Sequence, residues 1–241
     1  MQNQKAVALI PARAGSKRIA NKNVKLLGGH PLIAYTINSA IKSGVFDSVI
    51  CATDDIHYAE IARAYGAEVP FLRPQTISGD KSPDIEWVTW MLRELKSLGR
   101  NFETFSILRP TSPFRRPSTI QSAWKTFTEN PLADSLRAVE KCSQHPGKMW
   151  VVLGKTMQPL MPLKIGRVPW HSNQSAALPE IYVQNASLEI AWSRVALDQE
   201  SLTGEIIVPF ITKGLEGFDI NDTNDWVLAE HYIKDCPLDL Q

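Results

Sequence analysis

The chain alternates between short apolar runs and longer amphipathic segments. The apolar runs predict buried strands, which we place at residues 6–10, 48–52, 67–72, 104–108 and 135–139. Between them, apolar residues recur at helical spacing, which predicts helices over residues 31–44, 53–66, 87–98 and 117–130. Strands that alternate with helices are typical of an α/β fold, in which a mostly parallel sheet carries helices on both faces.

This regular pattern stops between residues 141 and 179. Scattered prolines and short apolar pieces there predict an insertion of short strands, and the alternative is a long surface excursion. The regular pattern then predicts strands at residues 181–183, 188–192, 206–211 and 217–220 and a last helix over 223–234. We therefore predict one α/β domain, built from residues 1–140 and 180–241, that carries a small insertion at residues 141–179.

The overall composition excludes several classes of partner. Lysine and arginine number 26 and aspartate and glutamate 25, so the net charge of +1 favours neither nucleic acid nor an anionic membrane. Cys51, Cys142 and Cys236 are widely spaced and form no zinc-binding or C-x-x-C pattern, which fits a reducing compartment such as the cytoplasm. The short polar start leaves no room for a signal peptide, and no apolar run approaches the ~18 residues of a membrane span.

The loop after the first predicted strand is strongly basic. It carries Arg13, Lys17, Arg18 and Lys22 around the small-residue turn 14–16. Small residues let backbone N–H groups approach an anion, and the spaced cations add charge, so a triphosphate fits such a loop. Neither the Walker loop pattern nor G-x-G-x-x-G is present, and the alternative is a solvated basic loop.

Other basic residues follow later strands of the predicted sheet. Arg73 comes after the third strand, and Arg109 comes after the fourth. Ligands of open α/β sheets bind at the carboxyl ends of the strands. We therefore expect Arg73 and Arg109 to converge with Arg13, Lys17 and Lys22 at one edge of the sheet.

The basic loop resembles the signature of the acylneuraminate cytidylyltransferases, also called CMP-sialic acid synthetases. The shared residues are Ile10-Pro11-Ala12-Arg13, Gly15-Ser16-Lys17 and Lys22-Asn23. The resemblance implies a Rossmann-like nucleotidyltransferase sheet and an enzyme that activates a nine-carbon keto acid sugar with CTP and releases pyrophosphate. It also implies a homodimer in which the insertion is a dimerisation arm, serving a surface polysaccharide, lipopolysaccharide or glycoprotein pathway.

The resemblance also implies roles for individual residues around the nucleotide. Lys22 would lie nearest the transferred phosphoryl group, and Asn23 would contact the ribose. Arg73 would lie near the cytosine, with Ser82 and Asp84 in the loop that closes on the base. The triphosphate would be held by Arg13, Ser16, Lys17 and Lys22, and the catalytic residues would be Arg13, Lys22 and Asp219.

A magnesium site is expected late in the chain, at Asp219 and Asn221. If residues 217–220 form a strand, its alternation places these two side chains on one face. Magnesium prefers hard oxygen ligands and combines one or two carboxylates with phosphate oxygens. The family usually has a second aspartate where this chain has Asn221, so either Asn221 coordinates through its amide oxygen or Asp222 does so instead. Alternatively, Asp222 or Thr223 caps the last helix.

The expected sugar pocket departs from the family pattern at two positions. Arg109 replaces the usual glutamine before Pro-Thr-Ser-Pro, and Glu189 stands where a tyrosine is expected. Glu189 could pair with Arg109, or it could accept hydrogen bonds from the sugar. Asn185 matches the family's substrate strand, and Lys148 matches a His-Pro-x-Lys segment that could reach the sugar carboxylate. We infer a nonulosonic acid other than plain N-acetylneuraminic acid.

Two alternative functions stay open. A cytidylyltransferase for an eight-carbon keto acid such as Kdo usually carries a different loop in place of Leu-Arg-Pro-Thr-Ser-Pro, which counts against it. A nucleotide-sugar binding protein without catalysis is supported only by Asn221, while Arg13, Lys17 and Lys22 argue for an enzyme.

Overall fold

The computed structural model describes residues 5–235, so Cys236 lies outside the described residues. The chain divides into two compact units. The larger unit contains the residues up to 138 and those from 185 onward, and the smaller unit is residues 139–184. The insertion expected at 141–179 falls within the smaller unit, and its role as a dimerisation arm stays a prediction.

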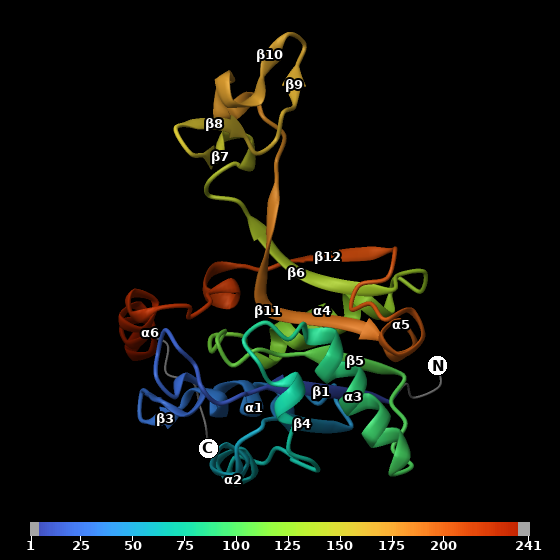
Figure 1. Ribbon diagram of the computed structural model, residues 1–241. Helices are drawn as coiled ribbons and strands as arrows, with labels where there is room; N and C mark the ends of the chain where they lie inside the picture. The colour runs from blue at the N-terminus through green and yellow to red at the C-terminus, as the bar shows by residue number, and fades with distance from the viewer. Residues whose placement is uncertain (1–4, 236–241) are drawn as a thin grey trace. The chain divides into compact units, whose positions relative to one another are not determined.

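A six-stranded sheet forms the centre of the larger unit (Figure 1). Its strands, in spatial order, are β12 (Ile207–Ile211), β6 (Ser135–Lys141), β11 (Tyr182–Trp192), β5 (Thr104–Ile107), β1 (Ala6–Pro11) and β4 (Ser48–Ala52). Strand β1 pairs in parallel with β4 and β5, and β11 runs antiparallel to β5 with Glu189 opposite Ile107. The mostly parallel α/β sheet predicted from the sequence is confirmed.

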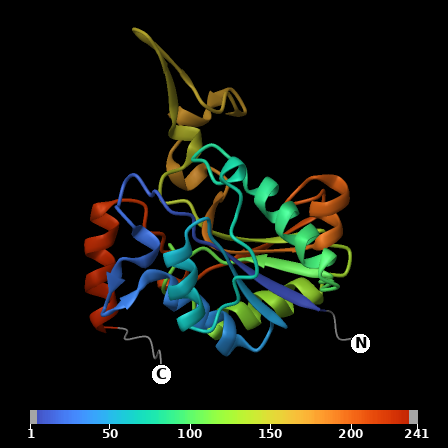
Figure 2. The ribbon, with the colours of Figure 1, turned by 60° about the horizontal axis from the view of Figure 1, so that its bottom comes forward.

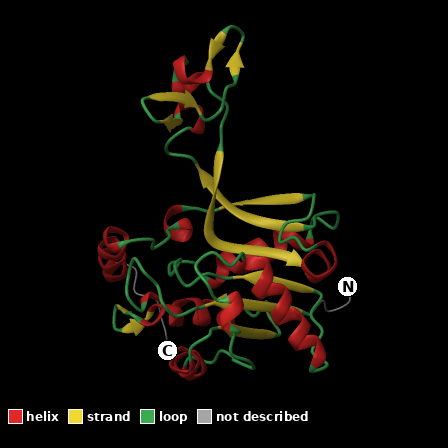
Figure 3. Ribbon diagram, viewed as in Figure 1, coloured by secondary structure: helices red, strands yellow, loops and turns green. Residues whose placement is uncertain are grey.

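Helices cover both faces of this sheet, as Figures 2 and 3 show. The α-helices are α1 (Leu32–Ser43), α2 (Ile56–Ala64), α3 (Asp84–Ser97), α4 (Pro117–Thr128), α5 (Ser193–Gln199) and α6 (Thr223–Asp235). Successive residues of a strand face opposite sides, and β1 follows this rule. Ala8 and Ile10 pack against α1, α2 and α4, whereas Val7 and Leu9 pack against α3 and α5.

Local sequence signals explain several helix ends. Gly44 ends α1 with a φ of 64°, a left-handed conformation that glycine adopts without steric cost. Asp55 caps α2, because its side chain accepts a hydrogen bond from the backbone N–H of Tyr58 at 3.0 Å. Pro117 begins α4, where its missing N–H leaves no helical hydrogen bond unmade.

A third apolar cluster connects the basic loop with the last helix. Ile19 of the loop and Leu27 of the short strand β2 (Leu26–Leu27), which pairs with β3 (His30–Pro31), pack with Ile220 and Trp226. The 3₁₀ helices of the larger unit are η1 (Lys22–Val24), η2 (Gln75–Ile77) and η6 (Gly214–Gly217). This packing brings the basic loop and the last helix to one side of the sheet.

Two predicted strands are wrong. In residues 67–72 only Glu68 pairs with the sheet, through an isolated bridge to Ile50, because Pro70 cannot donate a ladder hydrogen bond. In the predicted strand 217–220, Gly217 ends η6 and the other residues are irregular, since the backbone groups of Ile220 bond to two loops instead of a neighbouring strand. The two strands predicted at 181–192 form the single strand β11.

The smaller unit consists of short elements, as predicted for the insertion. One hairpin pairs β7 (Trp150–Leu153) with β8 (Thr156–Pro159), and another pairs β9 (Lys164–Ile165) with β10 (Val168–Pro169). Its 3₁₀ helices are η3 (Pro146–Lys148), η4 (Trp170–Ser172) and η5 (Ser175–Ala177). No helix within residues 5–235 is both long and apolar enough to cross a membrane.

Candidate functional site

A cavity of about 260 Å³ opens at the edge of the sheet where β1 and β5 end. The loop after β1, the segment before α3 and the loop after β5 all contribute to its wall. Eight residues predicted for the site line it, namely Arg13, Ser16, Lys22, Asn23, Arg73, Ser82, Asp84 and Arg109. The expected convergence is therefore observed for Arg13, Lys22, Arg73 and Arg109, whereas Lys17 does not line the cavity.

Hydrogen bonds fix the shape of the basic loop. The backbone N–H of Ala14 donates to Asp54 Oδ1 at 2.8 Å, and Asn23 Nδ2 donates to the carbonyl oxygen of Arg13 at 3.2 Å. Asn21 has a φ of 51°, an uncommon left-handed conformation for a residue other than glycine. The buried Asn23 thus supports the loop, and its expected contact with a ribose stays a prediction.

Lys22 joins the basic loop to the segment that carries Asp219. Its Nζ donates to the carbonyl oxygen of Ile220 at 2.7 Å, and the N–H of Ile220 donates to the carbonyl oxygen of Thr111 at 2.8 Å. Burial lowers the pKa of Lys22, and the nearby Asp219 carboxylate only partly opposes this effect. Ile220 therefore connects two walls of the cavity and places Asp219 beside them.

Asp80 neutralises two of the loop cations. Its carboxylate lies 2.6 Å from Arg13 Nη2 and also forms an ion pair with Lys17. The hydrogen bond from Lys17 and the charge of Arg13 lower the pKa of the Asp80 carboxyl group. Sequence reasoning missed Asp80, because it lies far from the basic loop in the chain. An anionic ligand that bound these two cations would therefore compete with the Asp80 carboxylate.

Arg73 organises the loop before α3. It is buried, its Nη2 donates to the carbonyl oxygen of Ile77 at 2.5 Å, and its guanidinium carbon lies 5.2 Å from the ring centroid of Trp87. Burial lowers the pKa of Arg73, although Asp54 and Asp84 oppose this effect. Arg73 is thus held in the cavity wall by contacts with the protein itself.

Four charged side chains form a connected network at the other end of the cavity. Arg109 Nη2 lies 2.7 Å from Asp84 Oδ2 and 2.9 Å from Glu189 Oε1, and Glu189 Oε2 contacts Arg137 Nη1. The contact between Arg109 and Glu189 that the sequence left open is therefore present. Sequence reasoning missed Arg137. The strand order places β6 beside β11 and so brings Arg137 to Glu189, and this order is not visible in the sequence.

The charges of this network shift the pKa values of its members. Burial lowers the pKa of Arg109, but Glu189 and Asp84 outweigh burial, so the pKa is raised. Burial raises the pKa of Asp84, but Arg109 and a hydrogen bond from Trp87 Nε1 outweigh it, so the pKa is lowered. Arg109 and Asp84 are therefore both charged at neutral pH.

Of the sugar-binding residues predicted in the larger unit, Arg109 lines this cavity, whereas Asn185 and Glu189 do not. Asn185 Nδ2 donates to Thr212 Oγ1 at 2.8 Å, and Asn185 Oδ1 accepts from the backbone N–H of Ser187 at 3.2 Å. Lys148 belongs to the smaller unit, where its Nζ donates to the carbonyl oxygen of Asn173 at 2.5 Å. The roles of Asn185 and Lys148 toward a sugar stay predictions.

Asp219 is the candidate metal ligand with a free oxygen. Asn221 Nδ2 donates to Asp219 Oδ2 at 2.6 Å, so the two side chains meet although no strand places them there. Asp219 Oδ1 is buried and has no hydrogen-bond partner among the described residues. No group of three His, Cys, Asp or Glu residues within 5–235 could hold a metal by itself.

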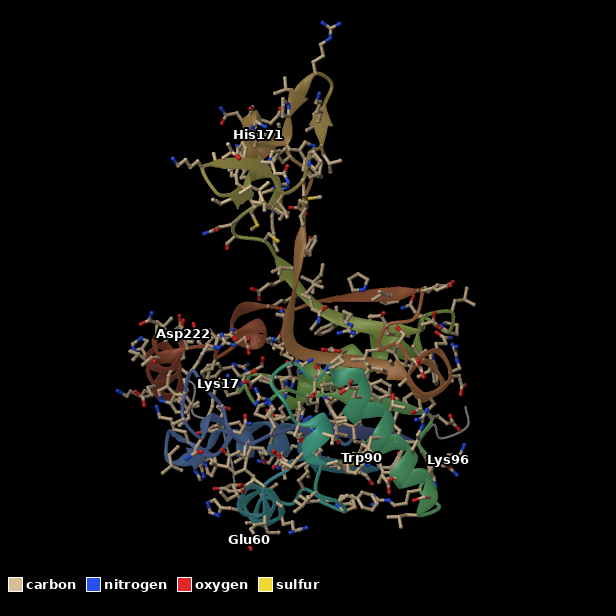
Figure 4. All side chains as sticks on the ribbon, in the orientation of Figure 1. Lys17, Glu60, Trp90, Lys96, His171 and Asp222 are labelled. Atoms are coloured by element: carbon tan, nitrogen blue, oxygen red, sulfur yellow. The ribbon has the colours of Figure 1, made fainter. Side chains whose placement is uncertain are left out.

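Asp222 has the capping role that the sequence left open. Its Oδ1 accepts hydrogen bonds from the backbone N–H groups of Asn224 and Asp225 at 2.8 and 3.1 Å, so it caps α6. Figure 4 shows Asp222 and Lys17 on the same side of the larger unit. The capping role is therefore observed, and the roles of Asp219, Asn221 and Asp222 toward magnesium stay predictions.

Comparison with known proteins identifies the family. Residues 7–145 match the sequence model described as "Cytidylyltransferase". The chain belongs to the cytidylyltransferase family. It is 33% identical to the CMP-N,N'-diacetyllegionaminic acid synthase of Legionella pneumophila, over 95% of this chain and 96% of that protein. The resemblance found in the sequence is thus confirmed.

Other relatives cover this cytidylyltransferase to different extents. The N-acylneuraminate cytidylyltransferase of Escherichia coli is 31% identical over 93% of this chain but only 51% of its own length. A pseudaminic acid cytidylyltransferase of Campylobacter jejuni is 36% identical over 52% of this chain and 54% of its own length. The fold matches a solved CMP:2-keto-3-deoxy-manno-octonic acid synthetase in complex with CTP, with a TM-score of 0.71 at 16% identity, over 96% of this chain and 99% of that structure.

Proposed function

We propose that this cytidylyltransferase activates a nonulosonic acid with CTP and forms a CMP-sugar and pyrophosphate. The observation that carries the proposal is the single cavity in which Arg13, Lys22 and Arg73 meet Arg109. The first three residues suit a nucleoside triphosphate, and Arg109 suits an acidic, acylated sugar. Relatives named for legionaminic, pseudaminic and N-acylneuraminic acid support this substrate class.

The proposed reaction is an in-line transfer of the cytidylyl group. The anomeric hydroxyl oxygen of the sugar attacks the α-phosphorus of CTP, the bond to the β-phosphate oxygen breaks, and the hydroxyl proton is released. Such a transfer requires positioning and neutralisation of negative charge on the phosphoryl oxygens. Lys22 would neutralise the transferred group, while Arg13, Ser16 and Lys17 would hold the triphosphate after Asp80 gives way.

Magnesium is the expected cofactor, and the residues present fit it. The Asp219 carboxylate has one buried oxygen without a hydrogen-bond partner among residues 5–235, and Asn221 adds an amide oxygen if its side chain turns over. When bound, magnesium would neutralise phosphate charge and orient the leaving pyrophosphate. Asp219 and Asn221 would hold it together with oxygens of CTP, since magnesium needs only one or two protein carboxylates.

A homodimer is supported by the surface of the smaller unit. Apolar side chains there are unusually exposed, with Val152 at 72%, Met157 at 58% and Leu153 at 53%. Exposed apolar groups of this kind are typical of surfaces that bind another protein. The proposed partner is a second copy of the chain, and the proposed location is the cytoplasm, where Cys51 and Cys142, free in the structure, would stay reduced.

The deciding experiment measures pyrophosphate release with CTP, magnesium and a panel of eight- and nine-carbon keto acid sugars. We expect release with a nine-carbon nonulosonic acid and weaker or no release with plain N-acetylneuraminic acid or Kdo. UTP in place of CTP is the matched control for the nucleotide. Release with Kdo alone would replace the proposal by the eight-carbon alternative, and CTP binding without release would favour the non-catalytic alternative.

A further inference from the structure

We propose that Arg137 is a positioning residue for the sugar end of the cavity, acting on Arg109 through Glu189. The proposal rests on the function proposed above, because it concerns how an acidic sugar is accepted. Arg137 does not line the cavity, whereas Arg109 does. Its effect on a substrate would therefore pass through the carboxylate that both arginines share.

The order of the strands explains how this contact arises. Arg137 is on β6, Glu189 is on the neighbouring β11, and Arg109 follows the end of β5, the next strand of the sheet. Glu189 and Ala191 are two residues apart on β11, and Ala191 packs in the cluster covered by α3 and α5. Because α3 begins with Asp84, the four charged groups follow one another across this face of the sheet.

Arg137 determines the net charge at this end of the cavity. Without it, the network would contain two carboxylates, Asp84 and Glu189, and one guanidinium, Arg109. That arrangement carries a net charge of −1 and would repel the carboxylate of a nonulosonic acid. With Arg137 paired to Glu189, the network is neutral, and Arg109 does not have to balance the charges of two carboxylates by itself.

Burial strengthens the electrostatic effect of Arg137 on the network. The side chain of Glu189 is 5% exposed and that of Arg137 is 12% exposed, so water screens their charges weakly. The Glu189 carboxylate is divided between the two arginines, with one oxygen for each. If Arg137 were removed, both oxygens would be available to Arg109, which would turn away from Asp84 and the cavity.

The test compares steady-state kinetics of the wild-type enzyme with those of Arg137→Met and Arg137→Lys. For Arg137→Met we expect the KM for the nonulosonic acid to rise by about tenfold or more, equivalent to about 1.4 kcal/mol, while the KM for CTP changes little. Arg137→Lys keeps the charge and should recover most of the loss. The matched control is Arg100→Met, which removes an ion pair with Glu68 outside the site.

The outcomes separate the inference from the proposed function. A rise in the sugar KM of Arg137→Met with an unchanged CTP KM, and recovery by lysine, would support the positioning role. Equal changes in both KM values, or the same change in Arg100→Met, would overturn it and leave the function standing. If none of the nonulosonic acids tested supported pyrophosphate release by the wild-type enzyme, the proposed function would fail, and this inference with it.

Discussion

Replacing Glu189 with glutamine tests how the charge network supports the fold. The change keeps the size of the side chain and removes its charge, so it adds no cavity and no overpacking. Arg109 keeps its contact with Asp84 at 2.7 Å. Arg137 loses the carboxylate that it contacts while its side chain stays 12% exposed. The substitution therefore leaves one buried cation without a counter-charge.

The expected cost follows from this geometry. Breaking a buried ion pair by removing one partner costs about 3–5 kcal/mol. Arg137 is not fully buried, and Arg109 stays paired, so we expect a value at the lower end, about 3 kcal/mol for Glu189→Gln. For a domain of this size, that loss lowers Tm by about 6–12 °C.

The assay is thermal and urea unfolding of the wild type, Glu189→Gln, Arg137→Met and the double variant at one protein concentration, because a dimer would make stability depend on concentration. The double variant removes both buried charges, so it should regain most of the stability that Glu189→Gln loses. A Glu189→Gln protein within about 1 kcal/mol of the wild type, or a double variant no more stable than Glu189→Gln, would refute the reasoning.

Three further predictions concern the rest of the site. Asp80→Asn should lower the KM for CTP several-fold at low ionic strength and less at high salt, because CTP no longer displaces a carboxylate from Arg13 and Lys17. Initial rates at two salt concentrations give the KM values that test this prediction. Lys22→Ala should lower kcat by about 10²–10³-fold without loss of the fold, seen in pyrophosphate release and circular dichroism, and near-normal turnover would contradict the role of the loop. The pKa of Asp84 is lowered in the folded protein, so its contribution to stability is present above the unfolded pKa of about 3.9 and is lost as pH falls through the lower folded value. Acid unfolding of Asp84→Asn should lack this contribution, and acid transitions identical to those of the wild type would contradict the prediction.

Much of the fold could be predicted because hydrophobic period and helix-end signals agree along the chain. Gly44 ends the helix predicted over residues 31–44, and Asp55 caps the helix predicted over residues 53–66. The strand predicted at 67–72 contains Pro70, which argues against a strand already in the sequence, whereas the strand predicted at 217–220 failed for a reason that composition does not reveal. The backbone of Ile220 forms hydrogen bonds with Lys22 and Thr111, so tertiary contacts replace the sheet that its apolar character suggested.

The site was predictable where one loop contains its residues and less so where separate elements meet. Arg13 and Lys22 are recognisable because their spacing within a single loop is specific. Asp80 and Arg137 are ordinary charged residues in sequence, and only the folded chain brings them to Lys17 and Glu189. Strand order was needed to place β6 beside β11, and sequence periodicity does not determine that order.

The network also changes how specificity at this site should be engineered. Arg109→Gln with Glu189→Tyr would restore the residues usual in the family and should favour N-acetylneuraminic acid. The structure adds that this double change leaves Arg137 buried without a carboxylate. We therefore expect the double variant to be poorly stable, and addition of Arg137→Met to restore stability by removing the unpaired cation. Selectivity between N-acetylneuraminic acid and the native sugar should then be measured on the triple variant, because only there is the substrate preference separated from the stability loss.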